Sequence, residues 1–153
     1  MLNVLHAHRR ERGTVLLLVP AAFLIMIVLG AIVVDVGLSQ VRARELEAVA
    51  SSAANDALGA LDIRSLRDTG EIRFDHDRAE GIVVESIANG ALPDAVLVAV
   101  GIGSDAAGRP QIAVTLRLDV AFIMAPALPG DLDSTTIMRT RTVAILGSVT
   151  PPA

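Results

Sequence analysis

An uninterrupted apolar stretch near the N-terminus constrains the fold more than any other feature of the sequence. Residues 14–34 (TVLLLVPAAFLIMIVLGAIVV) contain no charged side chain. A helix rises about 1.5 Å per residue, so a helix of this length spans the roughly 30 Å hydrocarbon core of a bilayer. Pro20 falls near the start of the stretch, where a missing N–H does least harm, and membrane helices tolerate a glycine such as Gly30. The stretch predicts a transmembrane helix.

The charges on its two sides predict the orientation of this helix. Arg9, Arg10 and Arg12 precede it with Glu11 as the one acid among them, whereas Asp35 follows it and the next basic residue is Arg42. Cytoplasmic flanks of membrane helices are enriched in basic residues. We therefore expect residues 1–13 to form a basic cytoplasmic tail. The remainder is then exported, on a protein held in the cell membrane by a single span.

A cleaved secretory signal is the alternative interpretation of the same stretch. The apolar region of such a signal normally runs for about 7 to 15 residues and ends at a site of small residues. Here the apolar region is longer, and the sequence AIVVDVGLS contains no A-x-A pattern. A retained anchor is the favoured prediction, and a mature chain that begins near Gly37 would contradict it.

Residues 35–61 predict an exported continuation of the same helix. Apolar residues recur there at helical spacing and form one broad stripe: Leu38, Val41, Leu46, Val49, Ala53, Ala57 and Leu61. Small side chains let a helix approach its neighbour closely, so the stripe predicts a packing interface. We expect the part from Ala53 to Leu61 to pack on the protein's own sheet, and the part from Leu38 to Val49 to pack on partner subunits.

Residues 62–153 predict a small α+β domain. A turn of helix is expected at 62–67, and a short second helix is expected from Asp75, which can cap it, to the stop signal Asn89-Gly90. The sequence QIAVTLRLDVAF then alternates strictly between apolar and polar residues, as a half-buried strand does. AVLVAVGIG and STTIMRTRTVAILG predict its two antiparallel neighbours. The fold class is therefore α+β, with a long N-terminal helix and a sheet of about three strands.

Composition narrows the range of functions. The formal charge of the 153-residue chain is −4, and the basic residues 9, 10 and 12 lie outside the exported part. The exported part is therefore acidic, which gives no support to nucleic-acid binding. The absence of cysteine rules out disulfides and thiolate chemistry. Cross-strand charge pairs on a solvated face are expected among the side chains of Arg117, Asp119, Arg139 and Arg141.

Candidate residues for catalysis or metal binding are few and scattered. His6 and His8 lie in the basic tail, and His76 lies at an expected helix start between two acids. The sequence DHDRAEG begins like a calcium loop, but Ala79 and Glu80 occupy a ligand position and the required glycine position. We therefore predict a non-enzymatic protein that has no catalytic residue, no cofactor and no metal site.

Two segments resemble a known family. Residues 9–58 combine an Arg-Gly motif, an apolar span with an early proline, an Asp at its exit and an alanine-rich helix (RRERGTVLLLVPAAFLIMIVLGAIVVDVGLSQVRARELEAVASSAANDAL). They resemble the N-terminus of the TadE/TadG-like proteins of the tight-adherence (Flp/Tad) pilus, especially actinobacterial ones. Residues 111–146 (QIAVTLRLDVAFIMAPALPGDLDSTTIMRTRTVAIL) are similar to the closing hairpin of the same group.

The resemblance implies a pilin-like fold and a minor pilin or pseudopilin of a secretion system involved in cell adhesion. Its implied partners are membrane lipid, other pilin-like subunits and the inner-membrane assembly proteins of the Tad apparatus. In related pilins a prepilin peptidase cuts after a glycine, which makes Gly13 and Thr14 a possible processing site. The fifth residue after that glycine is Leu18, where polymerising pilins carry a glutamate. This departure fits an accessory subunit that stays anchored. The alternative function is an anchored extracytoplasmic ligand-binding or sensor domain, with an enzyme as a third possibility.

Overall fold

The computed structural model describes the backbone of residues 7–127 and 133–145, and their side chains from residue 18 onward. Two compact units make up the chain. One, which we call the helix–loop unit, comprises residues 1–38 and 122–133, and the other, which we call the sheet unit, comprises residues 39–121 and 134–153. The helix α1 contributes residues to both units. The fold class is α+β, as the sequence predicts.

Helix α1 (Ala7–Ala57) is continuous from the basic segment through the apolar stretch into the sheet unit. The predicted continuation beyond Asp35 is thereby confirmed as helical. The helix begins earlier than expected, because residues 7–13 of the basic tail are already helical. Arginine and glutamate are good helix formers, which accounts for the early start. Pro20 consequently lies inside the helix and not in its first two turns.

Short helices follow the end of α1. The single turn η1 (Leu58–Ala60) leads to α2 (Ile63–Thr69), whose N-cap Asp62 accepts hydrogen bonds from the N–H groups of Arg64 and Ser65. The helix ends at Gly70, whose φ of 71° lies in the left-handed region that glycine adopts without strain.

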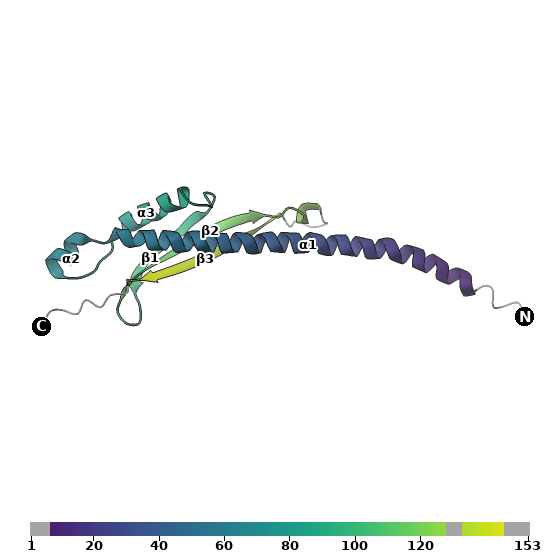
Figure 1. The fold of residues 1–153 in the computed structure, drawn as a ribbon, viewed down its shortest axis with the longest axis horizontal. Coiled ribbons are helices and arrows are strands. Elements are labelled where there is room, and N and C mark those ends of the chain that lie inside the picture. Colours follow the sequence, from purple (N-terminus) through teal and green to yellow (C-terminus); the bar gives the residue numbers. More distant parts are fainter. Residues whose placement is uncertain (1–6, 128–132, 146–153) are drawn as a thin grey trace, which may run out of the picture. The chain divides into compact units, whose positions relative to one another are not determined.

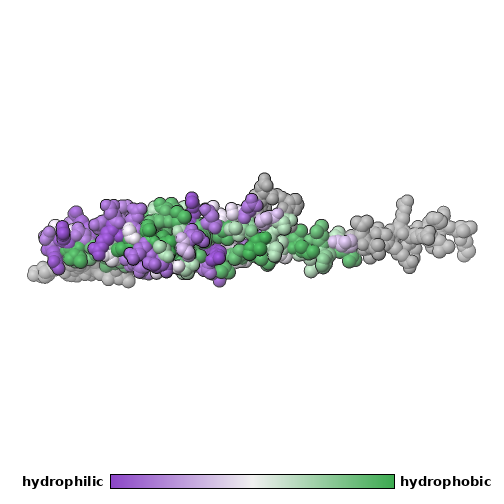
Figure 2. Space-filling model, turned by 90° about the horizontal axis from the view of Figure 1, so that it is seen from above, coloured by the Kyte–Doolittle hydropathy of each residue, from purple (hydrophilic) through white to green (hydrophobic). Residues whose placement is uncertain are grey.

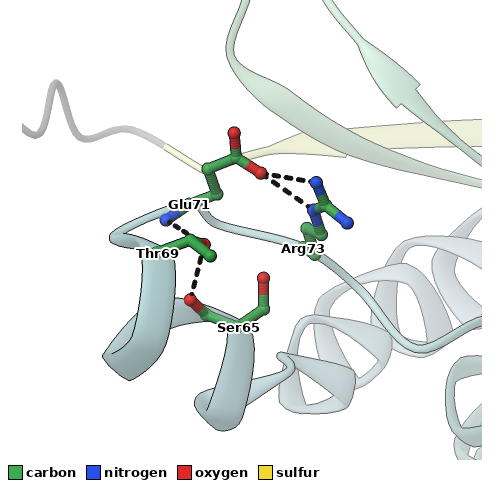
Figure 3. A network of polar contacts seen from close by, with 4 residues as sticks. All are labelled: Ser65, Thr69, Glu71 and Arg73. Carbon is green, nitrogen blue, oxygen red and sulfur yellow. Dashed lines mark hydrogen bonds and ion pairs between the residues drawn. The ribbon is translucent and has the colours of Figure 1, made fainter.

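Polar contacts hold the C-terminal end of α2 (Figure 3). The Thr69 hydroxyl donates to the Ser65 carbonyl at 2.8 Å and accepts from the N–H of Glu71 at 3.3 Å. Glu71 in turn accepts two hydrogen bonds from the Arg73 guanidinium, at 2.6 and 3.0 Å. All four side chains lie near the surface, so these contacts shape the turn and add little to stability.

Helix α3 (His76–Ala88) is the predicted short second helix, with Asp75 as its N-cap and Asn89 as its C-cap. Ala79, Val83 and Ile87 form its buried side. A hydrogen bond of 2.7 Å from the Ser86 hydroxyl to the Asp56 carboxylate links α3 to the end of α1. Helix α3 also contacts η1 and the first strand.

The antiparallel sheet has the order β1-β2-β3, formed by β1 (Val96–Ser104), β2 (Pro110–Ala121) and β3 (Ser134–Ala144). All three strands match the predicted segments. Central strand β2 pairs with β1 through Ser104↔Pro110 and with β3 through Ala121↔Ser134. A bulge between Leu97 and Ala99 interrupts the pairing of β1.

The turn between β1 and β2 depends on Asp105. Its carboxylate accepts from the N–H groups of Arg109 and Ala107, at 2.8 and 2.9 Å, and pairs with the Arg109 guanidinium at 2.6 Å. These hydrogen bonds, the backbone N–H of Arg109 first, hold the pKa of Asp105 below its ordinary value. Gly108 provides the positive φ of 75° that closes the turn.

The core of the sheet unit lies between α1 and one face of β2. The alternating residues Ile112, Val114 and Leu116 have no exposed surface, as the predicted alternation requires. Figure 1 shows the later part of α1 lying across the strands, and an ion pair between Glu47 of α1 and Arg141 of β3 fixes that contact. Arg141 therefore pairs with the helix, which corrects the expected cross-strand pair. Asp119 accepts from the Thr136 hydroxyl of β3 at 2.6 Å instead of joining an arginine across the strands.

Residue Ala53 tests this packing because it has no exposed surface. We expect Ala53→Glu to lower the free energy of unfolding by roughly 2–4 kcal/mol, because the carboxylate would be buried without a partner. Thermal unfolding of the full chain in detergent micelles measures the effect. The control is Ser52→Glu at the exposed neighbouring position, which should leave the melting temperature nearly unchanged. Equal melting temperatures for the two variants would contradict the packing.

Candidate functional site

The apolar segment of α1 exposes large side chains all around the helix. Phe23 is 65% exposed, Met26 71% and Val33 70%. Leu29, Ile32 and Val34 are about half exposed as well. Figure 2 shows these hydrophobic residues in green along α1. A helix that is apolar on every side requires an apolar environment.

By length and composition, α1 is the one helix in the described part of the chain that qualifies as a membrane span. Its apolar segment lies near the N-terminus, as the sequence predicts, and almost none of it is buried within the protein. Both features fit a membrane anchor. The apolar surface of this helix is the first part of the candidate site.

Asp35 provides the second part, directly after the apolar segment. It is only 5% exposed, although it is charged. Its Oδ1 accepts from the N–H groups of Ile123 at 2.9 Å and Met124 at 3.1 Å, and its Oδ2 accepts from Met124 at 3.2 Å and Ala125 at 2.7 Å. All of these residues belong to the helix–loop unit. One carboxylate thus holds three consecutive backbone N–H groups, an arrangement that we call the Asp35 clamp.

The clamp works because the loop presents its donors together. Ile123, Met124 and Ala125 lead into the single helical turn η2 (Ala125–Ala127), whose first N–H groups have no partner within the turn itself. A carboxylate at such an end satisfies these donors and is stabilised by them. Breaking the clamp would remove these hydrogen bonds from the carboxylate and take the acceptor away from three loop N–H groups, at a cost in free energy.

Sequence reasoning noted Asp35 as the residue at the exit of the span and missed its role. The available signal was a lone acid beside an apolar run, together with a second apolar run, FIMAPA, at 122–127. Their pairing across about ninety positions of sequence is not visible without a structure.

The predicted packing residues of α1 fall into three groups. Leu46, Val49, Ala53 and Ala57 are buried, Leu38 is half-buried and Val41 is 53% exposed. The expectation that Leu38 to Val49 meets partners is therefore wrong for Leu46 and Val49, which belong to the protein's own core. Leu61, the last residue of the stripe, is half-buried.

The buried face of α1 is set by alanines that the predicted stripe omitted. Ala43, Ala50 and Ala54 are buried beside Leu46 and Ala53. The buried residues of α1 are spaced alternately three and four positions apart, at 43, 46, 50, 53 and 57. This spacing places them on one face of the helix. Val41 is two residues, about 200° of helix rotation, from Ala43 and so points elsewhere. The prediction gave weight to large side chains and therefore included Val41, which lies off the buried face.

Gly13 and Thr14, the possible processing site, lie within α1. Their side-chain surroundings are outside the described residues, and whether the bond between them is cut stays a prediction. His6 lies outside the described residues, and His8 lies in the first turn of α1.

Among the described residues there is no group of three or more His, Cys, Asp or Glu side chains that could hold a metal. His76 is exposed at the start of α3 and lines an open groove of about 610 Å³ with Glu80, Val84, Ala95 and residues 96–100 of β1. The described lining of this groove is mostly aliphatic, so it does not gather the convergent polar groups that position a small ligand.

Comparison with protein-family models, curated proteins and solved structures finds no match to this chain.

The Asp35 clamp predicts a local effect of Asp35→Asn. The amide retains one oxygen acceptor and turns an NH₂ group toward the loop, so at least one N–H loses its partner, at a cost of about 1–3 kcal/mol. We expect hydrogen exchange at Ile123, Met124 and Ala125 to accelerate roughly tenfold or more. Asp119→Asn is the control, because Asp119 accepts from a hydroxyl and not from these N–H groups. Unchanged exchange at the three loop amides would contradict the clamp.

Proposed function

We propose that this chain is a non-enzymatic, single-pass membrane protein that serves as a pilin-like component of a Tad-type pilus or secretion apparatus. In this role it has a cytoplasmic N-terminus and an extracytoplasmic sheet unit. Its partners are membrane lipid, other pilin-like subunits and the inner-membrane assembly proteins of the apparatus.

One observation supports the proposal above the others. A single helix, α1, supplies both a segment that is apolar on every side and, further along, one wall of the core of a small α+β unit. Such a helix suits a subunit that is stored in a bilayer and used in an assembly, because the same element serves lipid contact and domain structure. The sequence resemblance of residues 9–58 to TadE/TadG-like proteins points the same way.

The exposed residue Val41 supplies a candidate contact for another subunit. It is 53% exposed on α1 and faces away from the buried alanines. Arg42 and Glu45 form an exposed ion pair of 2.9 Å on the same stretch of helix. An apolar side chain bordered by charges is a surface that a neighbouring helix can cover with modest affinity.

The alternative function, an anchored ligand-binding or sensor domain, has less support. A ligand site on the sheet calls for aromatic or convergent charged residues. The groove between α3 and β1 instead has Val84, Val96 and Val98 as prominent described lining residues, with His76 and Glu80 as its titratable ones.

The subunit contact predicts opposite effects of Val41→Glu on stability and assembly. Because Val41 is exposed, its replacement should change the free energy of unfolding by no more than about 0.5 kcal/mol. The new charge should nevertheless abolish pilus assembly and cross-linking to other pilin-like subunits. Gln40→Glu, at an exposed adjacent position on another side of α1, is the matched control and should spare both. Normal assembly of the Val41→Glu variant would contradict the pilin-like role.

The orientation is tested separately by protease added to intact protoplasts. We expect digestion of the chain beyond about Asp35 and protection of a tag at the N-terminus, because the basic residues 9–12 favour the cytoplasmic side. Protoplasts opened with detergent provide the control in which both ends are digested. Protection of a C-terminal tag in intact protoplasts would reverse the orientation.

A further inference from the structure

The loop that Asp35 holds has an unusual composition for an exposed segment. Its six residues, Phe122–Ala127 (FIMAPA), include no charged or polar side chain. Ile123 is 63% exposed and Met124 is 42% exposed. Large apolar side chains on an exposed loop usually mark a contact with another apolar surface or phase.

The backbone N–H groups of this loop are all hydrogen-bonded within the protein. The Phe122 N–H donates to the Asp133 carbonyl at 2.8 Å, and the Ala127 N–H donates to the Met124 carbonyl at 3.0 Å. The N–H groups between them, at residues 123–125, all donate to Asp35. Pro126 has no N–H. Every backbone N–H of the six residues therefore has an acceptor within the protein.

Satisfied donors matter because lipid offers no hydrogen bonds. Non-helical backbone normally stays out of the hydrocarbon region, since each unpaired group there costs several kcal/mol. In a loop that faces water or a polar protein surface, the N–H groups can donate to those surroundings and need no acceptor within the protein. The combination of apolar side chains and paired N–H groups therefore suits contact with lipid.

The position of the loop gives the same indication. It is held by Asp35, the residue that directly follows the apolar segment of α1, and both belong to the helix–loop unit. If α1 is an anchor, Asp35 lies where the helix leaves the hydrocarbon, and the clamp keeps Ile123 and Met124 at that level. The lipid contact of α1 thus continues onto the loop.

We propose that Phe122–Ala127 is a second membrane contact, in which Ile123 and Met124 insert into the boundary between headgroups and acyl chains. Asp35 is the positioning residue for this contact. The proposal rests on the membrane-anchor part of the proposed function and does not depend on a pilus role. The occupant of the loop surface is the lipid bilayer, because the surface is continuous with that of the anchor.

Single-cysteine labelling tests the contact, and the chain has no native cysteine to interfere. The full chain is reconstituted in phosphatidylcholine vesicles with an environment-sensitive fluorophore on Ile123→Cys. Phospholipids with nitroxides at shallow or deep positions serve as quenchers. We expect the Ile123 probe to lose most of its fluorescence to the shallow quencher. A probe on Ala106→Cys, in the turn at the other end of β2, should be unaffected.

A third probe on Met26→Cys separates failure of the loop contact from failure of the anchor. Met26 is 71% exposed near the middle of the apolar segment, nine residues before Asp35, and its probe should be quenched by the deep nitroxide. Quenching at Met26 without quenching at Ile123 would overturn the loop contact and leave the anchor standing. Quenching at neither position would overturn both. A blue-shifted but unquenched Ile123 probe would indicate a protein contact, such as a second copy, and would also overturn the proposal.

The role of Asp35 is tested in the same vesicles. Asp35→Asn should reduce shallow quenching of the Ile123 probe severalfold while deep quenching of the Met26 probe stays the same. The Met26 probe thereby confirms that the variant is still inserted. Equal quenching of Ile123 with and without the substitution would show that Asp35 does not position the loop.

Discussion

The Asp35 carboxylate is the interaction on which the helix–loop unit depends. A buried charge needs compensation, and three consecutive backbone N–H groups of the loop provide it. The compensation is mutual, because η2 begins at this point and its first donors have no partner within the turn. A helix residue and a loop about ninety positions later in the chain are thus joined by hydrogen bonds from backbone to side chain. Side-chain changes in the loop are therefore compatible with the clamp as long as its backbone conformation is kept.

Packing in the sheet unit obeys a different constraint, the small size of the residues on the buried face of α1. Ala43, Ala50, Ala53 and Ala57 are buried and bring little volume of their own to the core. The bulk of the core comes from the opposite side, from Ile112, Val114 and Leu116 of β2 and from Val83 of α3. Leu46 is the large fully buried side chain of α1. In this arrangement β2 and α3 supply most of the large side chains of the core, and α1 supplies mainly small ones.

Elements in which apolar and polar residues recur at a regular period could be predicted from the sequence. Contacts between elements distant in the sequence could not. The strict alternation of β2 identified its buried residues, and Asp75 and Asn89 marked the ends of α3 because caps act locally. Of the predicted packing residues of α1, Leu46, Val49, Ala53 and Ala57 are buried and Val41 is not, because in an alanine-rich helix several faces look nearly equally apolar. The Asp35 clamp and the Glu47–Arg141 pair depend on how the chain folds back, which no local pattern encodes.

The bulge at Leu97 and Ala99 has a consequence for a protein tethered to a surface. Chains confined to a membrane meet one another at a high effective concentration, and exposed strand edges are then prone to join. The sheet has two edge strands, β1 and β3. The bulge breaks the regular spacing of donors and acceptors along β1, and β3 carries the exposed Arg139, whose charge disfavours pairing with the same edge of another copy. Pairing between the sheets of two crowded copies is therefore disfavoured at both edges.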